Sequence, residues 1–184
     1  MNGFLMRLED FAWRTIYRLA FPLAQLWWLI RRARHEGALI AVYVGPDLLL
    51  LRSSYRRAWN FPGGGVRPWE TPERTARREL QEETGLLAPE LQARGSVHGF
   101  WEGRRDTVHF FELHLTEAPL VRVDNREIVR ARLVPPEEVK NLRLTGPVAA
   151  FLAQSAAREA SSGQSGPDFD PPADPCERHP TTTS

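Results

Sequence analysis

Three glutamates on one predicted helix are the residues of this sequence best placed to do chemistry. Glu79, Glu82 and Glu83 are spaced i, i+3 and i+4, so their carboxylates lie on one helical face about one turn apart. Like charges at these spacings destabilise a helix by roughly 0.2–0.5 kcal/mol per pair. A hard divalent cation relieves this repulsion, and Mg²⁺ and Mn²⁺ prefer carboxylate oxygens. The pattern therefore predicts a metal site, with a solvated acidic face as the alternative.

The predicted helix has defined ends and a flexible turn before it. Pro72 suits the first turn, because its missing N–H would have no partner there, and Gly85 ends the helix. Glycines occupy positions 63–65 and form a turn that can take positive φ and lets the backbone approach a ligand closely. A glycine turn directly before the acidic face favours the metal interpretation.

Residues 64–86 resemble the Nudix box at every fixed position. Five residues separate Gly64 from Glu70, and seven separate Glu70 from the Arg78-Glu79 pair. The remaining fixed positions are the aliphatic Leu80, then Glu82, Glu83 and Gly85, and the aliphatic Leu86. Chance would produce such a match on the order of 10⁻⁹ times per starting residue. The resemblance is strongest over residues 38–153 and includes the approach at residues 59–63. It implies an α/β/α sandwich with a mixed β-sheet, which the irregular order of predicted strands and helices also favours.

The resemblance also implies an activity. Nudix proteins typically hydrolyse a nucleoside diphosphate linked to another group, and they use divalent cations and an attacking water. Bound Mg²⁺ or Mn²⁺ is needed because the charges of a pyrophosphate repel a nucleophile. Glu79, Glu82 and Glu83 are the implied ligands, with the carbonyl of Gly63 as a further candidate. Glu79 could instead accept the proton of the water.

Further roles follow from the same resemblance. Arg78 and Glu70 match an ion pair that steadies the helix and the loop, and Arg78 is counted with the catalytic residues. Glu127 is a candidate acid outside the box, because residues 124–128 resemble the start of a late strand that often carries a functional carboxylate in the family. A surface glutamate beside two arginines would have the same sequence, so both interpretations stay open.

Candidate substrate-binding residues lie shortly before and at the start of the box. The guanidinium groups of Arg52 and Arg57 could bind phosphate, although a solvated loop would contain the same residues. Trp59 and Phe61 could stack on a base, although aromatic residues in such a loop more often pack in the core. Gly64 gives a substrate room to approach the backbone.

The sequence leaves the substrate open. ADP-ribose hydrolases of the family carry a Pro downstream of the box and dinucleoside polyphosphate hydrolases a Tyr, but residues 101–104 occupy that window here and contain neither. A nucleotide, a nucleotide-sugar or a dinucleotide is therefore compatible with the sequence. The alternative function is a non-catalytic nucleotide-binding or regulatory module that docks to a partner or membrane through its N-terminal helix. The intact acidic box favours the hydrolase.

Residues 4–34 predict an amphipathic helix outside the family-like region. Its apolar stripe repeats at spacings of three and four and consists of Leu5, Leu8, Ala12, Ile16, Leu19, Leu23, Leu26 and Ile30. Such a helix can pack on the domain, form a homodimer or make peripheral contact with a membrane. Its apolar part, residues 19–30, is too short to span a bilayer, which needs about 20 residues.

Length and composition indicate one domain with appended segments. The 184 residues are 42% hydrophobic, which is enough to bury a core. The predicted division is a helical segment at residues 1–36, a Nudix-like domain at 37–159 and a disordered Pro/Ser/Thr-rich tail at 160–184. A formal charge of +1 argues against a stable nucleic-acid complex. The single cysteine, Cys176, excludes an internal disulfide and indicates a cytoplasmic location.

Hydrophobic patterning predicts the elements around the box. Two continuous apolar strands form a first hairpin and should be covered on both faces. A second hairpin turns across residues 103–106. The predicted strands are 38–44, 48–52, 96–102, 107–115 and 127–134, and the predicted helices after the box are 136–142 and 146–158.

Overall fold

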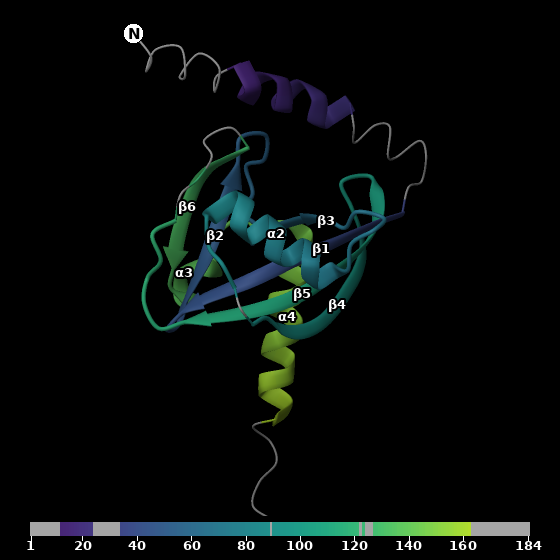
Figure 1. Cartoon of the computed structure of the whole chain (residues 1–184). Coiled ribbons are helices and arrows are strands. Elements are labelled where there is room, and N and C mark those ends of the chain that lie inside the picture. The colour runs from purple at the N-terminus through teal and green to yellow at the C-terminus, as the bar shows by residue number, and fades with distance from the viewer. Residues whose placement is uncertain (1–11, 24–33, 89, 122, 124–126, 163–184) are drawn as a thin grey trace, which may run out of the picture.

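The computed structural model describes residues 12–23, 34–88, 90–121, 123 and 127–162. A six-stranded sheet forms its centre, with the path β4-β5-β1-β2-β6 and with β3 paired to β1 (Figure 1). The strands are β1 (Arg34–Val44), β2 (Asp47–Ser53), β3 (Gly63–Gly65), β4 (Gln92–Trp101), β5 (Arg104–Leu115) and β6 (Ile128–Val134). The labelled helices are α2 (Pro72–Thr84), α3 (Pro136–Val139) and α4 (Gly146–Ser162), and residues 12–23 form another helix.

Strand β1 organises the sheet. β5 pairs with it in parallel along its whole length, from Arg34 to Val44. The other edge of β1 pairs antiparallel with β3 at residues 37–39 and with β2 at residues 43–44. The connection from β2 to β3 therefore returns along this edge, where the Ile40 N–H donates to the Pro62 carbonyl at 2.9 Å. One parallel pair among antiparallel pairs makes the sheet mixed, as the sequence predicts.

Helices cover both faces of the sheet. Alternate side chains of a strand point to opposite faces, so Ile40 and Val42 pack in the cluster that contains α2 residues, whereas Leu39 and Ala41 pack in the cluster that contains α4 residues. Figure 1 shows α2 and α4 on opposite sides of the sheet. This arrangement confirms the predicted α/β/α sandwich and its doubly covered strands.

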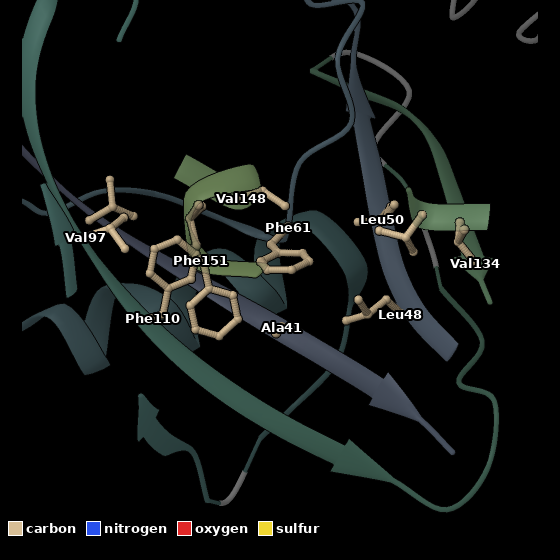
Figure 2. Packing of buried hydrophobic residues seen from close by; sticks show 12 residues of the cluster. Ala41, Leu48, Leu50, Phe61, Val97, Phe110, Val134, Val148 and Phe151 are labelled. Carbon is tan, nitrogen blue, oxygen red and sulfur yellow. The ribbon is translucent and has the colours of Figure 1, made fainter. Parts of the chain in front are cut away.

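Phe61 anchors the chain just before the glycine turn. Figure 2 shows its ring beside Phe110 of β5 and Phe151 of α4. Phe61 meets these two rings edge to face, at centroid distances of 6.4 and 6.0 Å. Phe110 and Phe151 stack on each other at 4.3 Å, and such pairs add about 0.5–1.5 kcal/mol beyond area burial. Because Phe61 is only 1% exposed, its ring serves core packing rather than base stacking.

The second hairpin is tighter than the sequence predicts. Its turn lies at Glu102 and Gly103, which take positive φ values of 51° and 84°. Residues 104–106, which the patterning assigns to the turn, are part of β5, because residues 105 and 106 pair with the start of β1. Helix α3 is also shorter than predicted and ends at Val139 instead of residue 142.

Two elements cross the predicted domain boundaries. β1 begins at Arg34, so the boundary between residues 36 and 37 falls inside this strand. α4 continues to Ser162, past the boundary at residue 159, and Ala156, Ala157 and Ala160 near its end have high helix propensity. Most of the tail predicted to be disordered, residues 163–184, lies outside the described residues.

The helix of residues 12–23 packs on the end of β2. The rings of Tyr17 and Phe21 lie 5.9 and 4.7 Å from the ring of Tyr55. Arg18 Nε donates to the Ser54 carbonyl at 3.0 Å. The docked face is therefore aromatic and basic, and its residues lie off the apolar stripe that the sequence predicts.

The predicted apolar stripe faces outward in this helix. Ile16, Leu19 and Leu23 belong to the stripe, and all three are exposed. The remainder of the predicted N-terminal helix, residues 4–11 and 24–33, lies outside the described residues. In the part of the chain that the structure describes, no helix combines the length and apolarity needed to cross a membrane.

Candidate active site

Local signals fix the ends of the helix that carries the acidic face. Thr71 Oγ1 caps α2 by accepting from the Arg74 N–H at 3.2 Å, and Pro72 occupies the first turn. Gly85, at φ 76°, ends the helix, and its N–H donates to the Gln81 carbonyl at 2.9 Å. The helix therefore begins and ends where the sequence predicts, which fixes the positions of its glutamates.

The glycine turn lies against this helix. Gly63 has φ 138°, and a Cβ there would collide with the Ala38 carbonyl, so only glycine fits. Its N–H donates to Glu83 Oε2 at 2.8 Å. A Cβ on Gly64 would lie 2.6 Å from the carboxyl carbon of Glu79. The missing side chain at Gly64 lets the Glu79 carboxylate approach the backbone of β3, and the Gly63 N–H holds the Glu83 carboxylate at the same strand.

Arg78 connects the acidic residues of the box. Its Nε and Nη2 donate to the two carboxylate oxygens of Glu70, each at 2.9 Å, which forms the ion pair implied by the family resemblance. Its Nη1 donates to Glu79 at 2.6 Å and to Glu82 at 3.1 Å. The hydrogen bonds from Arg78, with that from Thr75, lower the pKa of Glu70 to about 2. These contacts also raise the pKa of Arg78.

Glu79 is the more buried of the two carboxylates that share Arg78 Nη1. Its side chain is 19% exposed, compared with 56% for Glu82. Burial raises the pKa of Glu79 above its ordinary value, Arg78 opposes this shift, and the charges of Glu82 and Glu127 add to it. A partly desolvated carboxylate beside other carboxylates is typical of functional sites.

Glu127 approaches the same site from the start of β6. Tyr55 Oη donates to Glu127 Oε1 at 2.8 Å, and burial raises the pKa of Tyr55. Glu79, Glu83 and Glu127 line one cavity of about 800 Å³, which is within the usual range for small-molecule sites. The structure thus brings the candidate acid outside the box together with two of the box glutamates.

The other walls of the cavity come from distant parts of the chain. They include the glycine turn, the connection between β2 and β3, and Trp101 and Glu102 at the hairpin turn. Tyr17 and Phe21 of the N-terminal helix form one more wall. This helix is therefore part of the site, although it lies outside the family-like region of the sequence.

The predicted substrate-binding residues divide into two groups. Arg57 and Gly64 line the cavity, and so does Phe61, whose ring is nevertheless packed in the core. Arg52 and Trp59 are absent from the cavity lining. The Arg52 guanidinium lies over the Trp59 ring at 5.5 Å, and Trp59 packs against the core.

A polar group that the sequence does not predict also lines the cavity. Arg104 and Asp106 of β5 form an ion pair at 2.9 Å, and His35 Nδ1 lies 3.9 Å from Asp106. Burial, with the charges of Arg104 and Arg56, lowers the pKa of His35 to about 4, so this histidine is neutral at pH 7. The sequence carries no local signal for this group, because residues 35 and 106 meet only through the parallel pairing of β1 with β5.

The residues of the box fit a hard cation in donor type. Among the described residues, no group of three or more His, Cys, Asp or Glu side chains is already gathered for a metal ion. Arg78 Nη1 lies between Glu79 and Glu82, and Glu83 accepts from the Gly63 N–H. All three glutamates nevertheless offer oxygen ligands from one helical face, and Gly64 places no side chain of its own beside Glu79.

Comparisons with known proteins agree with this geometry. A family model described as the NUDIX domain matches residues 33–155. The RNA pyrophosphohydrolase of Pseudomonas savastanoi pv. phaseolicola is 33% identical over 100 residues, which cover 54% of this chain and 61% of that protein. This chain therefore matches less than two thirds of the length of that relative.

Solved structures share the fold. The MutT NUDIX hydrolase from Burkholderia pseudomallei superposes with a TM-score of 0.60 at 20% identity, covering 66% of this chain and 98% of that chain. The NUDIX domain of Shewanella oneidensis NrtR complexed with ADP ribose gives a TM-score of 0.57 at 17% identity, covering 68% of this chain and 87% of that chain. At these identities the likeness shows the fold alone, and it agrees with the α/β/α sandwich.

Proposed function

From the premise that this chain belongs to the NUDIX family, we propose that it is a Mg²⁺- or Mn²⁺-dependent hydrolase of a pyrophosphate linkage in a nucleoside diphosphate derivative. One observation carries the proposal. The Glu79 carboxylate lies against Gly64 and lines a cavity that Glu83 and Glu127 also line. Acidic oxygens that converge on a cavity large enough for a nucleotide are what metal-assisted phosphoryl chemistry requires.

Different residues of the chain would bind the cation and orient its ligands. Glu79, Glu82 and Glu83 would hold the cation, with the Gly63 carbonyl as a further ligand, and the cation would neutralise phosphate charge and make a bound water more acidic. Arg78 orients Glu79 and Glu82 while its other edge is fixed on Glu70.

A carboxylate must accept the proton of the attacking water. The family resemblance implies two candidates, Glu79, acting as the base instead of as a ligand, and Glu127, and both line the cavity. Burial raises the pKa of Glu79, which makes its carboxylate a stronger base than an ordinary glutamate. Glu127 is oriented by the hydroxyl of Tyr55. The oxygen of the water would then attack phosphorus, and the pyrophosphate bond would break.

A substrate panel tests the proposal. The purified chain with Mg²⁺ is incubated with nucleotide-sugars, ADP-ribose, coenzyme A, dinucleoside polyphosphates and nucleoside triphosphates. The name of the curated relative adds a 5′-triphosphorylated oligoribonucleotide to the panel. Turnover of one substrate, lost without divalent cations, supports the hydrolase. Tight binding of one compound without turnover of any would favour the non-catalytic sensor instead.

The N-terminal segment has a proposed role as well. Residues 4–34 would contact a second copy or a membrane surface, because Leu19 and Leu23 present an exposed apolar face. The domain itself would comprise residues 34–162, between this segment and the tail. A cytoplasmic location belongs to the same proposal and rests on the lack of a disulfide framework.

A further inference from the structure

A second hollow of about 660 Å³ lies beside the active-site cavity, at the end of β2. Its lining consists of Arg18, Arg52, Ser53, Ser54, Tyr55, Arg56, Arg57 and Val129. Four of these eight residues are arginines, and none is Asp or Glu. Arginine is always charged and presents several N–H donors in a planar fork, so this lining suits an anion with several oxygens.

Three of the four arginines have no carboxylate partner among the described residues. Arg56 is the exception, because its Nη2 lies 2.6 Å from Glu102 Oε2. Arg18 is held by the Ser54 carbonyl, Arg52 lies over the Trp59 ring, and Arg57 is exposed. The positive charges of these three arginines are therefore not paired with a carboxylate in the part of the protein that the structure describes.

Ser54 supplies a second, independent observation. The residue is only 8% exposed, and its hydroxyl has no hydrogen-bond partner in the described structure. The backbone around it is fixed, since the Ser54 N–H donates to the Glu127 carbonyl at 2.8 Å and the Ser54 carbonyl accepts from Arg18. Buried hydroxyls are normally hydrogen-bonded, so this one lacks a partner that a ligand oxygen in the adjoining hollow could supply.

The hollow adjoins the active-site cavity. Ser53, Tyr55, Arg56 and Arg57 line both spaces, so one extended ligand can occupy both. Arg18 belongs to the N-terminal helix and lies outside residues 33–155, which the NUDIX family model matches. The N-terminal helix thus provides a wall that the family domain does not supply.

We propose that this hollow is a second anion subsite, which binds a phosphate group of the substrate beyond the pyrophosphate that is cleaved. Arg18, Arg52 and the Ser54 hydroxyl would donate to the phosphate oxygens. The inference rests on the proposed function, because it takes the ligand to be part of the same substrate. The phosphate can come from a phosphodiester of an oligoribonucleotide or from a longer phosphoanhydride chain, and the test distinguishes these sources.

Binding to the full chain in metal-free buffer tests the subsite without hydrolysis. The probes are a 5′-monophosphorylated tetraribonucleotide and inorganic tripolyphosphate, titrated by calorimetry over a range of NaCl concentrations. The main variants are Arg52→Gln and Ser54→Ala, because these two residues line the hollow and not the cavity. Arg52→Lys keeps the charge, and Arg74→Gln removes an exposed arginine that lines neither space.

Each variant has its own expected result. Arg52→Gln should weaken binding about tenfold or more and should reduce the slope of log K against log salt by about 0.7 for the oligonucleotide. Arg52→Lys should restore the slope. Ser54→Ala should weaken binding without lowering the melting temperature, because it removes a buried unpaired hydroxyl. Arg74→Gln should leave both affinity and slope unchanged.

The outcomes separate this inference from the proposed function. A loss for the tetraribonucleotide alone identifies a phosphodiester, and a loss for tripolyphosphate alone identifies a phosphate chain; either supports the subsite. Wild-type affinity and slope in Arg52→Gln and Ser54→Ala for both probes would overturn it, even if the enzyme hydrolyses a substrate. Conversely, lost binding in a chain that turns over nothing would support the subsite and contradict the hydrolase.

Discussion

Gly64 and Glu79 share one space: a β-carbon on Gly64 would lie 2.6 Å from the carboxyl carbon of Glu79 and 2.6 Å from its Oε1. Real β-carbons do not approach other atoms so closely. Glu79 is on α2 and Gly64 is on β3, so this contact sets how near the acidic helix can lie to the glycine turn. The missing side chain at position 64 is thus a condition for the geometry of the site.

Gly64→Ala should therefore displace the Glu79 carboxylate. The atoms that must move are the far end of a flexible side chain, so we expect the free energy of unfolding to change by less than about 1 kcal/mol. We expect the hydrolysis rate to fall about tenfold or more, because small misplacements of a catalytic group are costly. Steady-state kinetics and thermal melts of the purified variant provide the two measurements.

A double-mutant cycle tests whether Gly64→Ala lowers the hydrolysis rate by displacing Glu79. If Gly64→Ala acts only through Glu79, it should cost little additional activity in a chain that already carries Glu79→Gln. Fully additive losses would show that position 64 contributes separately, for example by admitting substrate to the backbone.

Removal of one anionic ligand should reduce activity with little change in folding. Glu82→Gln and Glu83→Gln keep the shape of the side chain, and in the second variant the amide oxygen at position 83 could still accept from the Gly63 N–H. We expect kcat to fall by orders of magnitude in each variant and the half-saturating Mg²⁺ concentration to rise. The matched control is Glu73→Gln, which removes an exposed first-turn glutamate paired with Arg77. Wild-type rates in both box variants would contradict the metal assignment.

The sequence was most informative where structure is decided locally. Pro72 and Gly85 mark the ends of α2 with signals that act within a few residues. The continuous apolar runs of β1 and β2 follow directly from burial on both faces. The spacing of Glu79, Glu82 and Glu83 was therefore enough to place them on one helical face.

Features that depend on distant partners could not be predicted. The N-terminal helix docks through the face that contacts Tyr55. The hydrophobic pattern of the helix instead favoured burial of its apolar stripe, which is exposed in the structure. His35 reaches Asp106 only because β1 and β5 pair in parallel. The position of Arg52 over Trp59, away from the cavity, likewise depends on the path of the chain between β2 and β3.

The ion pair between Glu70 and Arg78 should give the protein a defined acid sensitivity. Its hydrogen bonds lower the pKa of Glu70 from 4.5 to about 2. A lowered folded-state pKa means that the stabilisation is complete above about pH 4.5 and is lost as the pH falls toward about 2. The stability difference between wild type and Glu70→Gln should therefore be constant above about pH 4.5 and should shrink below it.

Urea denaturation as a function of pH measures this difference. Glu73→Gln again serves as the control, because Glu73 is exposed and its pair with Arg77 lies on the helix surface. If the stability difference for Glu70→Gln were the same at about pH 3 as at about pH 7, the pKa of Glu70 would not be lowered in the folded state.

The two faces of the N-terminal helix should respond differently to substitution. Phe21 lies 4.7 Å from the Tyr55 ring, and the Arg56 guanidinium lies over Phe21 at 4.8 Å. Phe21→Ala removes both contacts and should lower the free energy of unfolding by about 1–2 kcal/mol. Leu19 and Leu23, by contrast, are 67% and 69% exposed, so they add little to the stability of the monomer.

Leu19→Glu combined with Leu23→Glu should therefore leave the melting temperature of the monomer unchanged while it abolishes association through the outer face. Two carboxylates on this face oppose burial against a second copy and insertion into a lipid surface. Light scattering measures the oligomer mass, and sedimentation with anionic liposomes measures lipid binding. Loss of the dimer alone identifies a homodimer interface, and loss of lipid binding alone identifies a membrane contact. A wild-type chain that is monomeric and does not sediment with liposomes would contradict both.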